Sequence, residues 1–284
     1  MRGLCLRAME RVAIQGELGS NSHVAALQVL EGAAAELLTC GVSAEVFERL
    51  GDGTATMAVL PIENSLHGSV FEHYDLLLES GVSVVGETML RIRHNVIAAP
   101  GVRLEDVRRV LSHPVALSQC RRWLREHPAI EAVPFYDTAG SVKHVMEAGL
   151  RDVAGIAPEL AAKGYGAEVI VGGVEDHREN YTRFYVLVQG APAEWDAGAN
   201  KASLAFSLEH RPGTLIEALE VFRRAGLNLT KIESRPVPGK PWEYVFFVDV
   251  RFEDAAGMDR VMAELRISCE MVRELGRYRA AELG

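Results

Sequence analysis

The chain has 284 residues, of which 48% are hydrophobic and 24% charged, enough for a sizeable core in one large domain or two. The net charge of -9 excludes a global basic field that would attract nucleic acid or acidic membranes, so local groups must hold any anionic ligand. The four cysteines form no CxxC pair, which favours a reducing cytoplasm, and no run of about 18 apolar residues indicates a membrane span.

The regular pattern begins at "MERVAIQG", after an apolar stretch that is too short and too interrupted for a signal peptide. We therefore expect Met9 to be the initiator and residues 1–8 to be an extension. The next stretch, "RVAIQGELGSNSHVAALQVL", predicts a strand, a glycine turn and a helix. The helix should begin near Ser20 or Ser22, because serine is a good N-cap residue.

The same order of strand, polar turn and helix recurs along the chain as far as residue 190. It is found in "TATMAVLPIENSLHGSVFEHYDLLLES", in "VRRVLSHPVALSQCRRWLREH" and in the segments that lead to "YTRFYVLVQ". Such alternation predicts an α/β architecture with mainly parallel sheets. Ligands of these sheets bind beyond the carboxyl ends of the strands, where the turns "GELGSNS", "PIENS" and "LSHP" are expected.

A second domain follows an Ala-, Gly- and Pro-rich segment at residues 191–201, which is predicted to be a linker. Residues 202–284 show the order βαββαβ, which is typical of a ferredoxin-like domain. We therefore predict one domain at 10–190 and another at 202–284.

Each of the three polar turns also has a purely structural explanation. In "GELGSNS" the glycines and a serine cap could simply begin a helix, although the free N–H groups of a helix start also suit an anion. In "PIENS", Glu63 follows an apolar strand and must be paired or solvated, while Asn64 and Ser65 could be capping residues. His113 in "LSHP" could be a turn residue, and no HxxxH or HExxH spacing supports a metal site.

The stretch "NYTRFYVL" brings four hydrogen-bond donors, residues 180–183, to the start of a strand. Alternation places Asn180, Thr182 and Phe184 on one face and Arg183 on the other, unless twist at the strand end brings both sets to one crevice. Thr182 can donate one hydrogen bond, and Arg183 offers a fork that matches a carboxylate. β-propensity and a structural ion pair would explain the same residues.

Taken together, the motifs resemble the prephenate dehydratase family with its regulatory ACT domain. The matching stretches are "GELGSNS", "LPIENSLHGSV", "LSHPVALSQC", "NYTRF", "RPGTLIEAL", "NLTKIESRP" and "WEYVFFVDV", in family order from Val12 to Tyr278. The first loop departs from a more usual "GPxGxxS", and Thr214 stands where the family often has Ala. With no chorismate mutase helix before the catalytic part, we expect a monofunctional enzyme.

The resemblance implies a catalytic domain of two lobes, like a periplasmic-type binding protein, with lobe one at about 10–90 and 172–190 and lobe two at about 91–171. It implies a lyase that converts prephenate to phenylpyruvate, CO2 and water without metal or organic cofactor. Thr182 corresponds to the family's essential threonine and is expected to donate a hydrogen bond to the departing hydroxyl. The residues expected to bind substrate are Glu63, Asn64, Ser65, Ser20, Ser22, Ser112, His113, Gln119, Asn180, Arg183 and Phe184.

The ACT resemblance implies phenylalanine as an effector, bound at an interface between regulatory domains in a dimer or a dimer of dimers. The residues expected to bind it are Gly213, Thr214, Leu215, Asn228, Glu233, Ser234, Arg235 and Pro236. Without the resemblance, "ESRP" would be read as a polar strand end.

Two other functions remain open from the sequence. The same chemistry on arogenate would give phenylalanine directly, and one chain does not separate an amino from a keto substrate. A non-catalytic amino-acid sensor would keep the cleft and "ESRP" but would not need Thr182.

Overall fold

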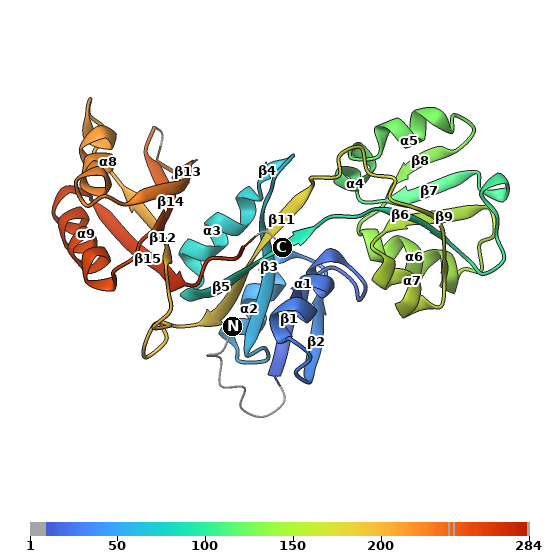
Figure 1. Ribbon diagram of the computed structural model, residues 1–284, viewed down its shortest axis with the longest axis horizontal. Helices are drawn as coiled ribbons and strands as arrows, with labels where there is room; N and C mark the ends of the chain where they lie inside the picture. The colour runs from blue at the N-terminus through green and yellow to red at the C-terminus, as the bar shows by residue number, and fades with distance from the viewer. Residues whose placement is uncertain (1–9, 238, 241, 283–284) are drawn as a thin grey trace. The chain divides into compact units, whose positions relative to one another are not determined.

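The computed structural model describes residues 10–237, 239–240 and 242–282, so the prediction for Met9 and residues 1–8 lies outside the described residues. The chain divides into two compact units (Figure 1). The two-lobed unit contains residues 10–70 and 88–184, and the C-terminal unit contains residues 71–87 and everything described from 185 onward. None of the helices in the described part of the chain is long and apolar enough to cross a membrane.

Lobe one is built on the sheet order β2-β1-β3-β11-β5, with β4 paired to β3. Its elements are β1 (Glu10–Gln15), α1 (Asn21–Leu30), β2 (Ala35–Cys40), α2 (Ser43–Gly51), β3 (Met57–Asn64) and β4 (Gly68–Ser69), and β5 (Val82–Arg91) and β11 (Tyr181–Gln189) continue into the C-terminal unit. β1 lies parallel to both β2 and β3. Val12, Ile14 and Val59 are fully buried, as expected for parallel strands covered on both faces.

Lobe two contains a second sheet, with the order β10-β6-β9-β7-β8. Its elements are β6 (Asn95–Ala98), a 3-10 turn (Leu104–Asp106), β7 (Arg109–Ser112), α4 (Pro114–Ser118), α5 (Arg121–Glu126), β8 (Glu131–Pro134), α6 (Thr138–Glu147), β9 (Val153–Ala157), α7 (Glu159–Tyr165) and β10 (Glu168–Gly172). β7 is parallel to β8 and β9, whereas β6 is antiparallel to β9 and β10. β6 departs from the parallel pattern because it enters directly from lobe one, without a helical crossover.

Two segments connect the lobes, one after β5 and one between β10 and β11. They lie side by side, since the N–H of Ile92 donates to the carbonyl of Asn180 at 2.7 Å. The returning segment places the start of β11 beside lobe two. The prediction of a two-lobed α/β domain is therefore confirmed.

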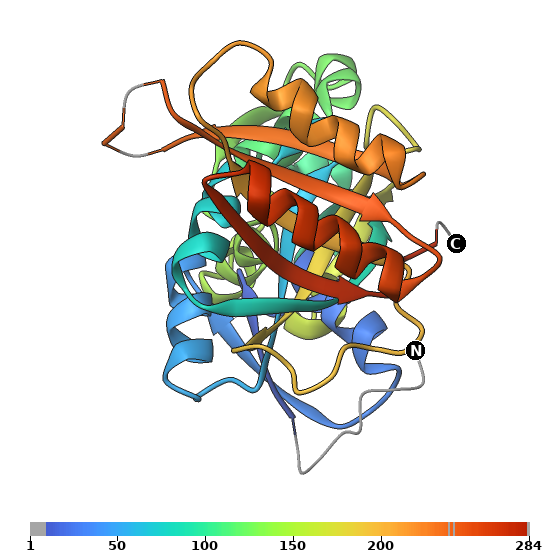
Figure 2. The same ribbon diagram turned by 90° about the vertical axis from the view of Figure 1, so that its left-hand side faces the viewer.

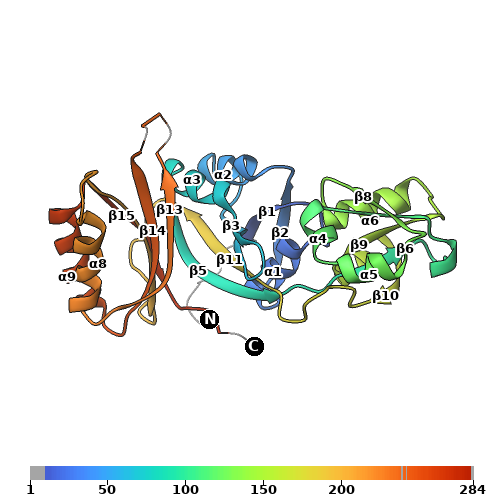
Figure 3. The same cartoon turned by 90° about the horizontal axis from the view of Figure 1, so that it is seen from above.

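The C-terminal unit is built on a four-stranded antiparallel sheet of order β13-β14-β12-β15. It comprises α3 (Phe71–Glu79), β12 (Lys201–Ser207), α8 (Thr214–Arg224), β13 (Asn228–Pro236), β14 (Tyr244–Arg251), α9 (Ala255–Ser268) and β15 (Met271–Tyr278). α8 and α9 cover one face of the sheet (Figure 2), and α3 lies on the other (Figure 3). From β12 onward the order is βαββαβ, so the predicted ferredoxin-like domain is confirmed.

Within the C-terminal unit, β15 approaches the backbone of β5 so closely that only glycine fits at position 276. A Cβ atom on Gly276 would lie 1.9 Å from the carbonyl oxygen of Val84. Nearby, Lys201 pairs with Glu87 of β5 at 2.9 Å, and both side chains are almost fully buried. The segment 71–87 therefore packs with the ferredoxin-like sheet as one body.

Candidate active site

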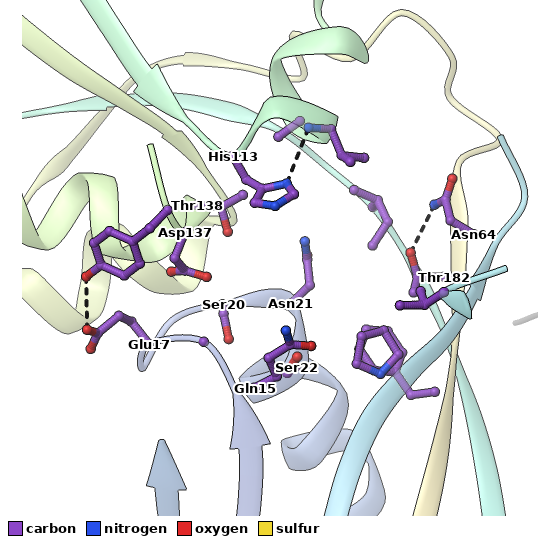
Figure 4. A pocket seen from close by; sticks show the side chains of 18 of the residues that line it. Gln15, Glu17, Ser20, Asn21, Ser22, Asn64, His113, Asp137, Thr138 and Thr182 are labelled. Atoms are coloured by element: carbon purple, nitrogen blue, oxygen red, sulfur yellow. Dashed lines mark hydrogen bonds between the residues drawn. The ribbon is translucent and has the colours of Figure 1, made fainter. Parts of the chain in front are cut away.

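A cavity of about 420 Å³ lies between the two lobes of the two-lobed unit (Figure 4). Seven of the twelve residues predicted to act on the substrate line it: Ser20, Ser22, Asn64, His113, Gln119, Thr182 and Phe184. The other five, Glu63, Ser65, Ser112, Asn180 and Arg183, are not among its lining residues.

The "GELGSNS" loop forms the lobe-one wall of the cavity and leads into α1. Gly19 adopts a positive φ of 90°, and Ser20 caps the helix by accepting a hydrogen bond from the N–H of His23 at 3.3 Å. The N–H groups of Asn21 and Ser22 belong to the first helical turn, which has no intrahelical acceptors. In Figure 4 the side chain of Asn21 points into the space between the two lobes. This wall therefore offers peptide donors and the positive end of a helix dipole to an anion.

The cavity is lined without any lysine or arginine among the described residues, and Glu17 and Asp137 are its carboxylates. Positive potential comes instead from the starts of α1 and of α6, where Thr138 also lines the cavity. An anionic ligand has to be held by N–H groups, amides and hydroxyls.

Thr182 lies at the side of the cavity, and its hydroxyl is oriented by Asn64 (Figure 4). The Nδ2 group of Asn64 donates to Thr182 Oγ1 at 3.0 Å and to Asn180 Oδ1 at 2.8 Å. Asn64 Oδ1 accepts from the N–H groups of Leu66 and His67, both at 3.0 Å, which fixes the amide orientation. Thr182 Oγ1 is thus an acceptor here, and no acceptor for its own proton is recorded among the described residues. The proton is available to a ligand.

Arg183 requires a correction of the predicted site. Its side chain is 5% exposed and pairs with Glu63, with Nη2 and Oε2 3.0 Å apart. Strand alternation directs residues 182 and 184 to the cavity and residue 183 to the opposite face. Twist at the strand end does not bring both faces to the cavity, so Arg183 and Glu63 are not placed to bind a ligand carboxylate.

The remaining predicted residues outside the cavity lining brace the strands around it. Ser112 is fully buried and donates to the carbonyl of Ile156 at 2.6 Å. Ser65 accepts from the N–H of Tyr181 at 3.0 Å and so ties the turn after β3 to the start of β11. Asn180 is fully buried, and its side-chain amide bonds to Asn64 and Gln119, which line the cavity.

The sequence analysis missed a group of residues where the lobes meet. Tyr136 donates to Glu17 Oε1 at 3.0 Å, and Lys143 Nζ lies 3.1 Å from Glu17 Oε2. Burial and the hydrogen bond to Glu17 raise the pKa of Tyr136 to about 12. Asp137 caps α6 by accepting from Gly140 N at 2.6 Å, and burial raises the pKa of its carboxyl. The signal was the Asp-Thr pair before a helical pattern, an N-cap motif that does not reveal which loop it faces.

Two cavity histidines are neutral near pH 7. Burial lowers the pKa of His94, opposed by the hydrogen bond of its Nε2 to Gln119 at 2.8 Å. Burial also lowers the pKa of His113, whose Nδ1 accepts from Val115 N at 3.3 Å. Across the described ranges, no group of three or more His, Cys, Asp or Glu side chains is arranged to hold a metal ion.

The predicted effector residues fall at two ends of the ferredoxin-like sheet. Gly213, with φ 93°, is the N-cap residue of α8, and Thr214 and Leu215 open that helix. The "ESRP" residues end β13, where Arg235 binds Asp75 of α3 through two hydrogen bonds of 3.3 and 2.8 Å. Asn228 begins the same strand and pairs with Arg251, so eight residues, roughly 25 Å, separate it from Pro236. One chain therefore does not bring Asn228 to the others.

Comparison with known proteins agrees with the motifs. Residues 12–191 match the family model described as "Prephenate dehydratase", and residues 202–266 match that described as "ACT domain". The chain belongs to the prephenate dehydratase family. The resemblance inferred from the sequence is thus confirmed, and the ferredoxin-like domain is an ACT domain.

Family relatives include plant and bacterial proteins. "Arogenate dehydratase/prephenate dehydratase 2, chloroplastic" of Arabidopsis thaliana is 39% identical over 282 residues, covering 94% of this chain and 72% of the relative. "Bifunctional chorismate mutase/prephenate dehydratase" of Aquifex aeolicus is 33% identical over 282 residues, covering 99% of this chain and 76% of the relative.

Two solved structures superpose with a TM-score of 0.86. One is prephenate dehydratase in complex with L-Phe from Arthrobacter aurescens, 30% identical, with 95% of this chain and 90% of that chain covered. The other, described as "GqqA- a novel type of quorum quenching acylases", is 34% identical, with 95% and 98% covered. Members of this fold thus carry different functional descriptions, and the chemistry must be argued from the site.

Proposed function

We propose that this member of the prephenate dehydratase family catalyses the decarboxylating dehydration of prephenate to phenylpyruvate, CO2 and water. The observation that carries the proposal is the Thr182 hydroxyl, which faces the cavity as an acceptor of Asn64 and keeps its proton for a ligand.

The reaction needs help mainly at the departing hydroxyl. The bond between the ring and its carboxylate breaks, its electron pair completes the aromatic ring, and the C–O bond to the hydroxyl breaks. Thr182 donates a hydrogen bond to that oxygen as negative charge develops on it. A neutral alcohol is a poor net proton source, so solvent supplies the proton that turns hydroxide into water.

The cavity is suited to a dianion without cationic side chains. The N–H groups at Asn21 and Ser22, with the hydroxyl of Ser20, would hold one carboxylate. Phe184 lines the cavity and would form an apolar wall against the ring. Because none of the described lining residues is an arginine or a lysine, the ring carboxylate would be weakly bound, which favours its loss as CO2.

The test is purified protein with prephenate at neutral pH, with phenylpyruvate followed by its absorbance in alkali. Product well above the control without enzyme is the expected result. If the control rate is not exceeded under conditions in which the protein is folded, the proposal is wrong.

Arogenate is the second candidate substrate, and the acidic residues of the cavity favour it. Glu17 and Asp137 line the pocket, and an ammonium group could lie against either. Glu17 is already paired with Lys143, however, which weakens that attraction. Running arogenate beside prephenate and measuring kcat/KM for each decides between them.

Acyl transfer has less support from the site. A serine or cysteine nucleophile is usually activated by a hydrogen-bonded histidine. Among the described lining residues, the two histidine rings bond to Gln119 and to the N–H of Val115, not to a serine or cysteine side chain.

We further propose that L-phenylalanine regulates the enzyme through the ACT domain of a dimer or tetramer, and that the protein works in the cytoplasm. Three findings support the effector: the ACT match, the L-Phe complex of the Arthrobacter relative, and the "ESRP" strand end. Because Asn228 lies far from the other predicted residues within one chain, a site that includes it needs a second ACT domain.

A further inference from the structure

We propose that His67 is a positioning residue for Thr182, acting through a chain of hydrogen bonds that passes along Gln119, Asn180 and Asn64. Its kinetic consequence rests on the dehydratase function proposed above. His67 lies in the turn between β3 and β4 of lobe one, and Gln119 is the C-cap residue of α4 in lobe two. The contact therefore exists only when the two lobes meet.

The tautomer of His67 follows from the groups around its ring. Ser118 Oγ lies 2.7 Å from the carbonyl of Val115, and a carbonyl only accepts, so the hydroxyl donates there. His67 Nε2 lies 3.0 Å from the same Oγ and must therefore be the donor to it. His67 Nδ1 is then the unprotonated nitrogen, and it accepts from Gln119 Nε2 at 3.1 Å. The geometry therefore assigns the donor role to Nε2 and the acceptor role to Nδ1.

That assignment sets the direction of every bond as far as Thr182. With its NH2 group on His67, Gln119 presents Oε1 to Asn180 Nδ2 at 3.0 Å and to His94 Nε2 at 2.8 Å. Asn180 then presents Oδ1 to Asn64 Nδ2 at 2.8 Å, and the same Nδ2 donates to Thr182 Oγ1 at 3.0 Å. The backbone N–H groups of Leu66 and His67, which donate to Asn64 Oδ1, demand the same orientation independently.

Without the His67 ring, the NH2 group of Gln119 loses the acceptor that holds it at 3.1 Å. The backbone N–H groups of Leu66 and His67 keep Asn64 in its orientation, so the chain does not reverse. The expected consequence is that Gln119 and Asn180 place Asn64 less firmly against Thr182 Oγ1. The recorded ring partners of His67, Ser118 and Gln119, are both uncharged.

Among the described residues, the titratable residues His94, Glu175 and Asp176 lie next to this chain of hydrogen bonds. Burial keeps the pKa of His94 low, and Glu175 accepts from the backbone N–H of His94 at 3.0 Å. The backbone N–H of Asp176 donates to the carbonyl of Gln119 at 2.7 Å. None of the three is a ring partner of His67, whose ring bonds to Ser118 and Gln119.

Two amide substitutions separate the two ring nitrogens. In His67→Asn the side-chain oxygen reaches the position of Nδ1 and can accept from Gln119, whereas the longer chain of His67→Gln places its amide near Nε2. We expect His67→Asn to keep kcat within about 3-fold and His67→Gln and His67→Ala to lose roughly 3- to 15-fold, with KM within about 2-fold. His210→Asn, at an exposed histidine of the C-terminal unit, is the matched control.

The ¹⁵N NMR signals of the His67 ring, assigned with His67→Asn, test the tautomer without reference to turnover. A proton on Nε2 and none on Nδ1 at pH 7.5 is expected, and a proton on Nδ1 overturns the proposal. Equal kcat in the wild type and all three variants, in an enzyme that turns over prephenate, overturns it as well. Absence of turnover in the wild type is instead a failure of the proposed function, and the NMR result then decides on His67.

Discussion

Thr182 and Asn64 form the smallest part of the site that can be tested alone. Thr182→Ala removes the hydroxyl that we propose donates to the departing oxygen, and we expect kcat to fall about 100-fold or more with little change in KM. Thr182→Ser keeps the hydroxyl and should retain most of the rate. Steady-state kinetics with prephenate measure both, and unchanged melting temperatures exclude misfolding. Near-wild-type turnover by Thr182→Ala would contradict the donor role.

Glu63 and Arg183, in contrast, are predicted to contribute to stability and not to substrate binding. Glu63→Gln preserves shape but leaves the buried guanidinium of Arg183 without its carboxylate. Because Glu63 is 34% exposed, water offsets part of the loss, and we expect the free energy of unfolding to fall by about 1–3 kcal/mol. Urea titration measures this fall. A large rise in KM for prephenate with unchanged stability would restore the carboxylate-binding role.

Among the elements, α3 of the C-terminal unit contacts the "ESRP" end of β13. Asp75 of α3 binds Arg235 of "ESRP", and the Arg235 guanidinium lies 4.9 Å from the ring of Phe71, which follows the cavity residue Val70. We expect Asp75→Asn to shift the phenylalanine concentration of half-maximal effect about 5-fold while leaving kcat unchanged, because it weakens the pair that holds Arg235, one of the residues proposed to bind phenylalanine.

A matched control lies in the hairpin between β13 and β14. Lys240 and Glu243 form an exposed pair 3.1 Å apart, and Glu243→Gln should leave the phenylalanine response unchanged. Equal phenylalanine titrations of wild type and Asp75→Asn would show that the Arg235–Asp75 pair carries no coupling.

The helices and strands themselves were largely predictable from the sequence, whereas the side of each element that lines the cavity was not. Strand and helix patterns are local, so Ser20 was recognisable as the N-cap of α1 and "NYTRF" as a strand start. Whether Arg183 met substrate depended on the side of β11 that lobe two covers, and twist left that open. Asp137 was missed as a cavity residue because its other hydrogen-bond partner, the backbone of Glu17, lies in a loop about 120 residues earlier. The local sequence pattern predicts where each turn occurs. Which turns line the same cavity depends on contacts between distant segments, and only the folded lobes show these.

At the scale of the molecule, the boundary of compact packing does not coincide with the boundary of the family models. The ACT match begins at residue 202, yet the C-terminal unit also includes residues 71–87 and 185–201. Buried polar contacts explain this: Tyr185 donates to Asp249 at 3.0 Å, and Lys201 pairs with Glu87. β11 (Tyr181–Gln189) therefore has residues in both units, with Thr182 in the two-lobed unit and Tyr185 in the C-terminal unit.

The stability of the whole chain should depend on pH through its buried histidines. Burial lowers the pKa of His23, His94 and His113 below the ordinary value of 6.5, so the unfolded chain binds protons more readily than the folded chain in that window. The stabilisation is complete above pH 6.5 and is lost as pH falls from there toward the folded pKa values. Asp137 acts in the opposite direction. Burial raises the pKa of its carboxyl above 3.8, so its contribution to the free energy of unfolding increases as pH falls.

Urea titrations at pH 7.5 and 5.5 measure the difference in the free energy of unfolding. We expect the wild type to be less stable at pH 5.5, and the drop to be smaller in His94→Gln, because glutamine cannot take up the proton that burial excludes. His177→Gln, at an exposed position, should show the full wild-type drop. An equal drop in His94→Gln would mean that the His94 ring is protonated as easily in the folded chain as in the unfolded one. The assignment of a neutral His94 ring hydrogen-bonded to Gln119 would then be wrong.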